Sequence, residues 1–94
     1  MPFPNQTPRP FTKAGIEWLA PNQNGVYGIF RQGCWIYIGR GDLRTRLLYH
    51  LDAKNALIGN QMPTHYVTVI TQNDVALEKS LIVEFQPLAN QKVG

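Results

Sequence analysis

The sequence is poor in cysteine: Cys34 is the only one among 94 residues. A single thiol cannot form an intrachain disulfide, and a zinc site built from cysteines is excluded. The chain also lacks an apolar run that could cross a bilayer, and its first residues lack the basic-then-apolar pattern of a signal peptide. We therefore expect a cytoplasmic protein that has no membrane partner.

Charge is scarce as well, since only 16% of the residues are charged and the formal net charge is +3. This balance favours an anionic partner, but alone it is equally typical of a surface that happens to be basic. Four of the five arginines, however, fall close together in the chain, at Arg31, Arg40, Arg44 and Arg46. With 94 residues, the chain has room for one small domain and one hydrophobic core.

Proline is concentrated at the beginning of the chain, where residues 1–10 contain four prolines and little to bury. We expect residues 1–11 to form an extended or disordered arm and residues 12–94 to form a single domain. Thr12 is placed to cap a short helix that Pro21 ends.

What is present is organised around the stretch from residue 25 to residue 50, GVYGIFRQGCWIYIGRGDLRTRLLYH. It predicts two strands joined by a turn at residues 31–34, and then a helix that begins near residue 42 or 43. Alternation along the strands predicts that Tyr27 and Ile29 share one face, and that Trp35 and Tyr37 share one face. Phenols next to a group of arginines suit a phosphate ligand.

The helix after the second strand has an apolar stripe made by Leu43, Leu47, Leu48 and Leu51. Arg46 and His50 lie four residues apart along one border of this stripe, so both can reach over the edge of the sheet. Arg44 projects into the stripe, where its stem can lie on apolar surface while its charged end reaches water.

The last part of the chain predicts a third strand over residues 64–71 and a helix over residues 75–85, capped by Asn73 or Asp74. This helix has a core stripe of Leu77, Leu81, Ile82 and Phe85, and Glu78 lies in its middle. A carboxylate that faces a core is costly unless a cation or metal satisfies it. The pattern predicts an α+β fold: a three-stranded antiparallel sheet flanked by helices, in the order α-β-β-α-β-α.

The segments GVY, YIG, LRTRL and LEKSLIVEFQPLAN follow one another between residues 25 and 90. Together they resemble the motifs of the GIY-YIG nuclease superfamily, and the pattern is most similar to the nuclease domain in bacterial nucleotide-excision repair. The resemblance implies a metal-dependent endonuclease that hydrolyses DNA phosphodiester bonds. It implies one Mg²⁺ or Mn²⁺ ion and no obligate small-molecule cofactor.

The resemblance also implies roles for individual residues. The catalytic group consists of Tyr27, Tyr37, Arg46, His50 and Glu78, with Glu78 as the metal ligand. The residues expected to bind substrate are Arg40, Arg44 and Asn90, and the glycines that flank the tyrosines are Gly25 and Gly39. Arg46 would donate to the phosphate oxygens. A tyrosine would take the proton from water, and Tyr27, Tyr37 and a relay through His50 all remain open.

Other interpretations are compatible with the same residues. Glu78 could pair with Arg46 in a buried bridge, and Asn90 could cap backbone groups instead of touching substrate. A non-catalytic module could use the same basic groove to bind nucleic acid without cutting it. The proline-rich arm could instead recruit a partner. The DNA structure that is cut and the oligomeric state are left open.

Overall fold

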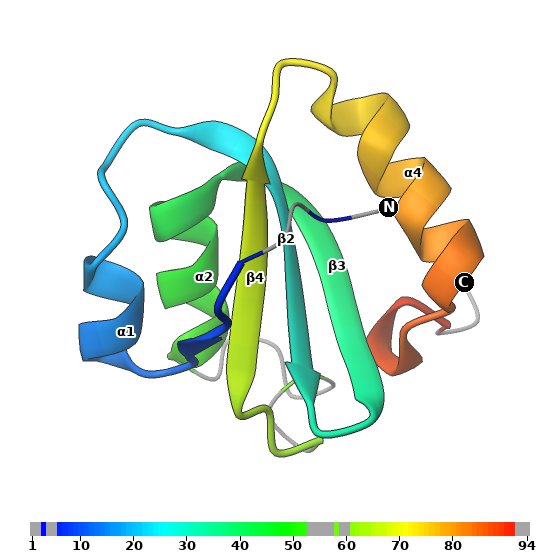
Figure 1. Ribbon diagram of the computed structural model, residues 1–94, viewed down its shortest axis with the longest axis horizontal. Helices are drawn as coiled ribbons and strands as arrows, with labels where there is room; N and C mark the ends of the chain where they lie inside the picture. Colours follow the sequence, from blue (N-terminus) through cyan, green and yellow to red (C-terminus); the bar gives the residue numbers. More distant parts are fainter. Residues whose placement is uncertain (1–2, 4–5, 53–57, 59–60, 92–94) are drawn as a thin grey trace.

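The structure is a computed structural model that describes residues 3, 6–52, 58 and 61–91 (Figure 1). Its elements are β1 (Arg9–Pro10), α1 (Lys13–Glu17), β2 (Asn24–Arg31), β3 (Cys34–Asp42), α2 (Leu43–Leu51), β4 (His65–Ile70), α4 (Asp74–Phe85) and the short 3₁₀ helix η1 (Leu88–Gln91). This confirms the predicted α+β class and the predicted order of the main elements. No helix within the described residues is long and apolar enough to cross a membrane.

The sheet is antiparallel and has four strands in the order β1-β4-β2-β3, rather than the predicted three. The additional strand is β1, whose two residues Arg9 and Pro10 pair with Tyr66 and His65 of β4. It lies within residues 1–11, which were expected to be extended or disordered. A two-residue strand carries no alternation, and proline is tolerated at a sheet edge, so the sequence pattern did not reveal it.

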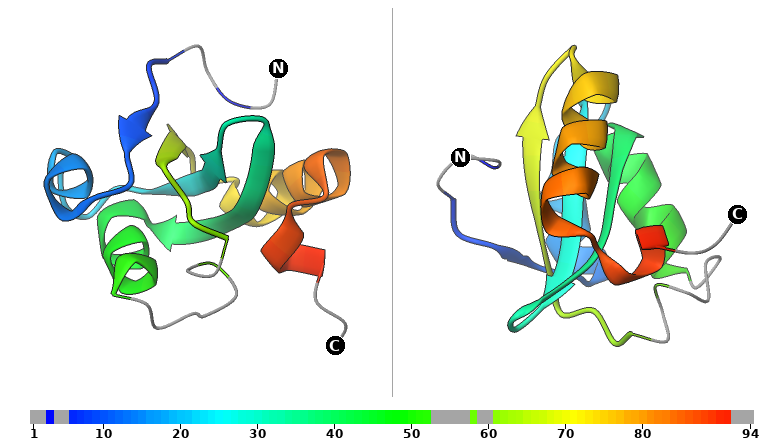
Figure 2. Two further views of the ribbon diagram at one scale, coloured as in Figure 1. Left: turned by 90° about the horizontal axis from the view of Figure 1, so that it is seen from below. Right: turned by 90° about the vertical axis from the view of Figure 1, so that its right-hand side faces the viewer.

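Helices cover both faces of the sheet, with α1 and α2 together on one face and α4 on the other (Figure 2). We call these the α2 face and the α4 face. Tyr27 and Ile29 are both buried on the α2 face, as predicted. The α4 face is closed by the buried residue Leu81 of α4, with the partly buried Leu77, Ile82 and Phe85 around it. The predicted core stripe of α4 is therefore confirmed.

A β-bulge changes the faces of β3. Phe30 pairs with Trp35, whereas its neighbour Ile29 pairs with Tyr37, so Ile36 is one residue too many on the β3 side. Trp35 consequently packs on the α4 face and Tyr37 on the α2 face. The prediction that Trp35 and Tyr37 share a face is wrong, because an inserted residue shifts the alternation by one. The bulge places Tyr37 on the same face as Tyr27.

Side chains define where the helices begin. The Asp42 carboxylate accepts a hydrogen bond from the Thr45 N–H (3.1 Å) at the start of α2. Thr12 likewise accepts a hydrogen bond from the Gly15 N–H (3.1 Å) at the start of α1, as predicted. In contrast, the N-cap residue of α4, Asn73, makes no side-chain capping bond. Asp74 is the first residue of α4, and its carboxylate is used elsewhere.

A side-chain amide pairs with the backbone at each side of the sheet. Asn90, in η1, accepts a hydrogen bond from the Ile38 N–H (2.8 Å) and donates one to the Ile38 carbonyl (3.1 Å) on β3. Gln6 accepts from the Thr68 N–H (3.1 Å) and donates to the Thr68 carbonyl (2.7 Å) on β4. We call Asn90 and Gln6 the edge amides. Each one supplies both bonds that a further strand residue would make.

Candidate active site

The centre of the candidate site on the α2 face is a pair formed by Tyr27 and His50. The Tyr27 hydroxyl and the His50 Nε2 atom are 2.8 Å apart and buried. Strand β2 presents Tyr27, and the last turn of α2 presents His50, which is only 3% exposed. The sequence placed His50 at the border of the helix stripe, whereas the structure buries it against the tyrosine.

Burial shifts the ionisation of both members of this pair. Desolvation lowers the pKa of His50 to about 4, and the nearby Arg46 guanidinium acts in the same direction. Desolvation also raises the pKa of Tyr27 above that of a free phenol, and the neighbouring Tyr37 adds to the rise, whereas Arg46 opposes it. At neutral pH, His50 is therefore uncharged and Tyr27 keeps its proton. A neutral imidazole has one ring nitrogen that accepts, so Nε2 can accept the Tyr27 hydroxyl.

Gly39 makes room for the Tyr27 ring. A Cβ atom at Gly39 would overlap the hydroxyl and ring of Tyr27 and would also touch the Tyr37 ring. Gly25 serves a different purpose, since a Cβ there would overlap the backbone carbonyl of Val69 in β4. The two glycines predicted to flank the tyrosines thus permit two close approaches, one by the Tyr27 side chain and one by a neighbouring strand.

Tyr37 and Arg46 complete the group on the α2 face. The Tyr37 ring lies 5.0 Å from the His50 ring and 6.2 Å from the Tyr27 ring, between centroids, and it is half-buried. Arg46 is exposed on α2, with its guanidinium carbon 5.2 Å from the centroid of the Tyr49 ring. Burial raises the pKa of Tyr37, the Glu78 carboxylate raises it further, and Arg46 lowers it. The cation and the two phenols therefore lie within electrostatic reach of one another.

On the α4 face, Arg40 of β3 contacts two carboxylates of α4. Its Nη1 atom donates a hydrogen bond to Oδ2 of Asp74 (3.2 Å), and its Nε atom lies 3.6 Å from Oε1 of Glu78. Among the described residues, Arg40 and not Arg46 is the ion-pair partner of Glu78. Asp74 was expected only as a possible cap of the last helix and not as a residue of the site. The signal was present, because Asp74 lies four residues before Glu78 and therefore on the same side of the helix.

Glu78 is turned toward the sheet, as the position in the helix stripe predicted. Its side chain is 25% exposed, and burial raises its pKa, with Arg40 opposing and Asp74 reinforcing the rise. Glu78 also acts on the phenols, since its charge contributes to the raised pKa of Tyr37. The groups on the two faces of the sheet are thus coupled around β3, which is one of the two edge strands.

The residues present fit a divalent cation at Glu78, although sparsely. A half-buried carboxylate whose charged form is destabilised by burial is a hard oxygen ligand of the type that Mg²⁺ and Mn²⁺ prefer. No group of three or more His, Cys, Asp and Glu residues that could hold a metal occurs in the described part of the chain. Water and phosphate oxygens would have to complete the coordination shell.

The remaining predicted residues lie around this site. Arg44 is half-buried on α2, and its buried Nε atom has no hydrogen-bond partner among the described residues. Asn90 uses its amide on the Ile38 backbone, which corresponds to the capping alternative. Because Ile38 lies between Tyr37 and Gly39, this pairing fixes the segment of β3 that carries the site. The role of Asn90 in binding substrate stays a prediction.

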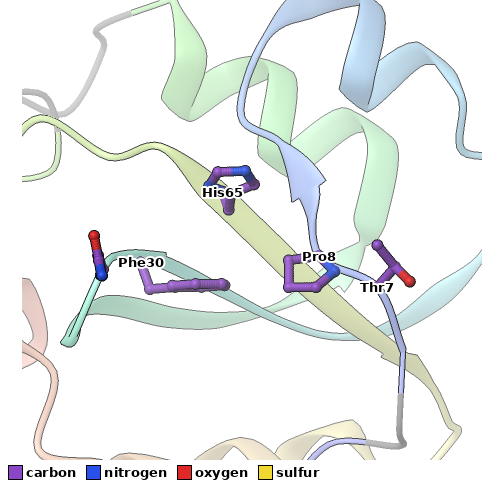
Figure 3. Close-up of a pocket in the computed structure, with 5 residues that line it drawn as sticks. Thr7, Pro8, Phe30 and His65 are labelled. Atoms are coloured by element: carbon purple, nitrogen blue, oxygen red, sulfur yellow. The ribbon is translucent and has the colours of Figure 1, made fainter.

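A hollow of about 450 Å³ lies apart from this site, and none of the predicted catalytic residues lines it. Figure 3 shows Phe30 of β2 and His65 of β4 facing the N-terminal residues Thr7 and Pro8 across it, with Gln32 also contributing. The candidate site is therefore arranged around the edge strand β3 and not inside this hollow.

Comparison with solved structures finds several structures of one and the same domain. The chain is similar to the GIY-YIG N-terminal endonuclease domain of UvrC from Thermotoga maritima, in a tyrosine-to-phenylalanine variant bound to its catalytic divalent cation. The identity is 30%, the match covers 82% of this chain and 96% of that one, and the TM-score is 0.67. The magnesium-bound structure of the same domain matches with 30% identity and a TM-score of 0.67, over 80% of this chain and 94% of that one.

No protein-family model and no curated protein matches the sequence. The structural match nevertheless joins an identity of 30% to nearly complete coverage of the relative, and it agrees with the motifs that carry Tyr27, Tyr37, Arg46, Glu78 and Asn90. The arrangement of these residues around β3 and the likeness to a solved endonuclease domain lead to one conclusion: the chain belongs to the GIY-YIG nuclease superfamily.

Proposed function

We propose that this protein is a metal-dependent endonuclease that hydrolyses phosphodiester bonds in DNA. The observation that carries the proposal is the position of Glu78, which is half-buried beside the edge strand and influences the ionisation of Tyr37. A binding module without a metal has no need for a carboxylate there. The relatives are endonuclease domains bound to a catalytic divalent cation, which supports the same assignment.

Glu78 and Arg46 are the residues that we assign to the phosphate. A divalent cation held by Glu78 would polarise the phosphate oxygens and lower the pKa of the attacking water. Arg46 is exposed on α2 and carries no ion pair among the described residues. A side-chain hydrogen bond from Arg46 lowers the pKa of Tyr27, and its remaining N–H groups would donate to the non-bridging oxygens. Its planar donor fork suits this bidentate task, which lysine performs poorly.

Tyr27 is the phenol that we assign to the transfer of the proton. Because its pKa is raised by burial, Tyr27 cannot be a standing phenolate at neutral pH. It has an acceptor 2.8 Å away in His50, which is neutral because burial lowers its pKa to about 4. We propose a relay in which the water proton passes to the Tyr27 oxygen while the Tyr27 proton passes to His50 Nε2. Because its low pKa makes His50 a weak base, it releases this proton again, and the leaving oxygen takes up one proton in the complete reaction. Tyr37 is half-buried, and its ring lies next to the rings of Tyr27 and His50.

The proposal is tested with purified protein, Mg²⁺ or Mn²⁺, and plasmid, nicked, flap and junction DNA. Glu78→Ala and Arg46→Ala should each lower kcat by about 10²–10³-fold. Glu84→Ala and Lys79→Ala remove the same types of charge from exposed positions of α4 and should retain the wild-type rate. If wild type and all variants are equally inert, yet DNA binding persists and weakens with salt, the protein binds nucleic acid without cutting it.

A further inference from the structure

Asp74 is a buried acidic residue that the proposed reaction does not use. Its side chain is 12% exposed, and its Oδ2 atom accepts the hydrogen bond from Arg40 Nη1 at 3.2 Å. It is also the first residue of α4, where a helix usually keeps its acidic residues in water. Burial opposes the charged form of Asp74, but hydrogen bonds from the Arg40 and Asn24 side chains outweigh it and lower the pKa of this carboxyl group.

The two contacts of Arg40 are unequal. The distance to Asp74 is that of a hydrogen bond, whereas the 3.6 Å between Arg40 Nε and Glu78 Oε1 is an ion pair that is too long for one. Arg40 therefore stands beside Glu78 without occupying its oxygens. The Arg40 side chain is 45% exposed, so part of the guanidinium still faces solvent.

This arrangement bears on a metal at Glu78, because a guanidinium and a divalent cation would compete for the same carboxylate oxygens. If Arg40 were released from Asp74, the nearest carboxylate left to it would be Glu78, and arginine readily binds a carboxylate with two parallel hydrogen bonds. The pairing with Asp74 limits that competition, because it holds Arg40 at an ion-pair distance of 3.6 Å from Glu78 and short of a bidentate hydrogen-bonded contact.

We propose that Asp74 is a positioning residue that acts through Arg40. By holding Arg40 Nη1, it keeps the Glu78 carboxylate open to a divalent cation and leaves the solvent-facing N–H groups of Arg40 for a substrate phosphate. This inference rests on the proposed function only in taking Glu78 as the metal ligand. In this proposal, Asp74 contacts Arg40 and neither the metal nor the substrate.

The test is a double-mutant cycle with Mn²⁺ binding as the readout, measured by electron paramagnetic resonance on the full chain without DNA. In the wild-type background, Asp74→Ala should raise the Mn²⁺ dissociation constant by about tenfold, because the freed Arg40 closes on Glu78. In an Arg40→Gln background, the same substitution should change it by less than about twofold. Glu84→Gln, which removes an exposed acid from the same helix, is the matched control and should change nothing.

The outcomes separate this inference from the proposed function. Equal weakening by Asp74→Ala in both backgrounds would make Asp74 a direct electrostatic or ligand group and overturn the inference, as would no weakening in either background. If Glu78→Gln leaves Mn²⁺ binding unchanged, the metal site of the proposed function fails instead. Thermal unfolding of each variant without metal shows whether the chain is still folded, and Asp74→Asn provides a near-isosteric substitute if Asp74→Ala is not.

Kinetics give a second readout that a merely structural residue would not move. With DNA as substrate, the loss of activity in Asp74→Ala should be recovered by raising the Mn²⁺ concentration, because an excess of metal displaces Arg40 from Glu78. Residual weakening should then appear in KM, since Arg40 no longer faces the phosphate. A loss in kcat that saturating Mn²⁺ does not recover would contradict the positioning role.

Discussion

On the α2 face of the sheet, Tyr27 and His50 are buried and uncharged at neutral pH, and they hydrogen-bond to each other. On the α4 face, Arg40 and Glu78 keep part of their side chains in water and are held by ion pairs. Desolvation favours neutral groups that exchange protons, whereas partial exposure lets charged groups meet an ion or a phosphate. Strand β3 thus separates a buried, neutral pair on the α2 face, Tyr27 and His50, from the partly exposed ion pair of Arg40 and Glu78 on the α4 face.

The largest effect on activity is expected from removing the hydroxyl of Tyr27. Tyr27→Phe should lower kcat by about 10²–10⁴-fold with little change in KM, because it removes the proton relay and leaves the charged groups in place. Single-turnover cleavage assays measure this. Tyr66→Phe is the matched control, since Tyr66 is also buried on the α2 face but donates its hydrogen bond to the Gly15 carbonyl (2.7 Å). A greater loss in Tyr37→Phe than in Tyr27→Phe would instead assign the proton to Tyr37.

The pH dependence of stability tests whether the fold keeps His50 neutral on the α2 face. The native state keeps His50 neutral with a pKa of about 4, while the unfolded chain binds the proton at about 6.5. The contribution of His50 to stability is therefore complete above pH 6.5 and is lost as the pH falls toward 4. Relative to His50→Phe, the free energy of unfolding of the wild type should fall by up to about 3 kcal/mol over that range.

Urea unfolding at a series of pH values measures this difference. The substitution changes packing and removes the Tyr27 contact at every pH, so only the difference in slope reports on the titration of His50. Parallel curves for the two proteins between pH 7 and pH 4 would show that His50 is not kept neutral by the fold.

Gly39 is the position where the close approach of Tyr27 can be disturbed. Gly39→Ala would place a Cβ against the Tyr27 hydroxyl and the Tyr37 ring, and it should cost about 1–3 kcal/mol of stability through overpacking. It should also lower kcat, because Tyr27 must move relative to His50. Gly33→Asn is the control: Gly33 has a positive φ of 74° and open space around its Cα, and asparagine tolerates that conformation. Full activity in Gly39→Ala would contradict the tight geometry.

The smallest expected effects come from the edge amides, which allow a matched test of the two sides of the sheet. Asn90→Ala and Gln6→Ala should each lower the free energy of unfolding by about 1–2 kcal/mol, since each substitution removes two hydrogen bonds to backbone. Only Asn90→Ala should also lower kcat, because Ile38 adjoins Tyr37 and Gly39. Calorimetry and cleavage assays on the two variants provide the comparison, and equal effects on kcat would contradict it.

Elements with a clear periodicity of apolar residues were predictable from the sequence. The apolar stripe in α4 predicted both the core residues and the inward position of Glu78. The starts of two helices, after Thr12 and near residue 42 or 43, were also predicted. The bulge at Ile36 was not predictable, because the inserted residue is as apolar as its neighbours and leaves no mark in the alternation.

The pairings of the site depend on tertiary structure and were predicted only in part. The resemblance placed Tyr27 and His50 in one catalytic group, but their direct contact depends on how α2 packs against β2. The pair of Arg40 and Asp74 joins residues 34 positions apart on different elements, and Asp74 looked like an ordinary capping residue. Sequence patterns describe the faces of single elements, whereas such pairs depend on how two elements cross.

The edge amides have one further consequence, which concerns how separate molecules meet. An outer strand with free N–H and C=O groups is a template on which another chain can add a strand, the first step toward fibrillar assembly. Asn90 and Gln6 occupy these groups at Ile38 and Thr68 with side chains that cannot be extended into a further strand. The same amides that order β3 at Ile38 and β4 at Thr68 thus protect these positions of the sheet from pairing with another chain.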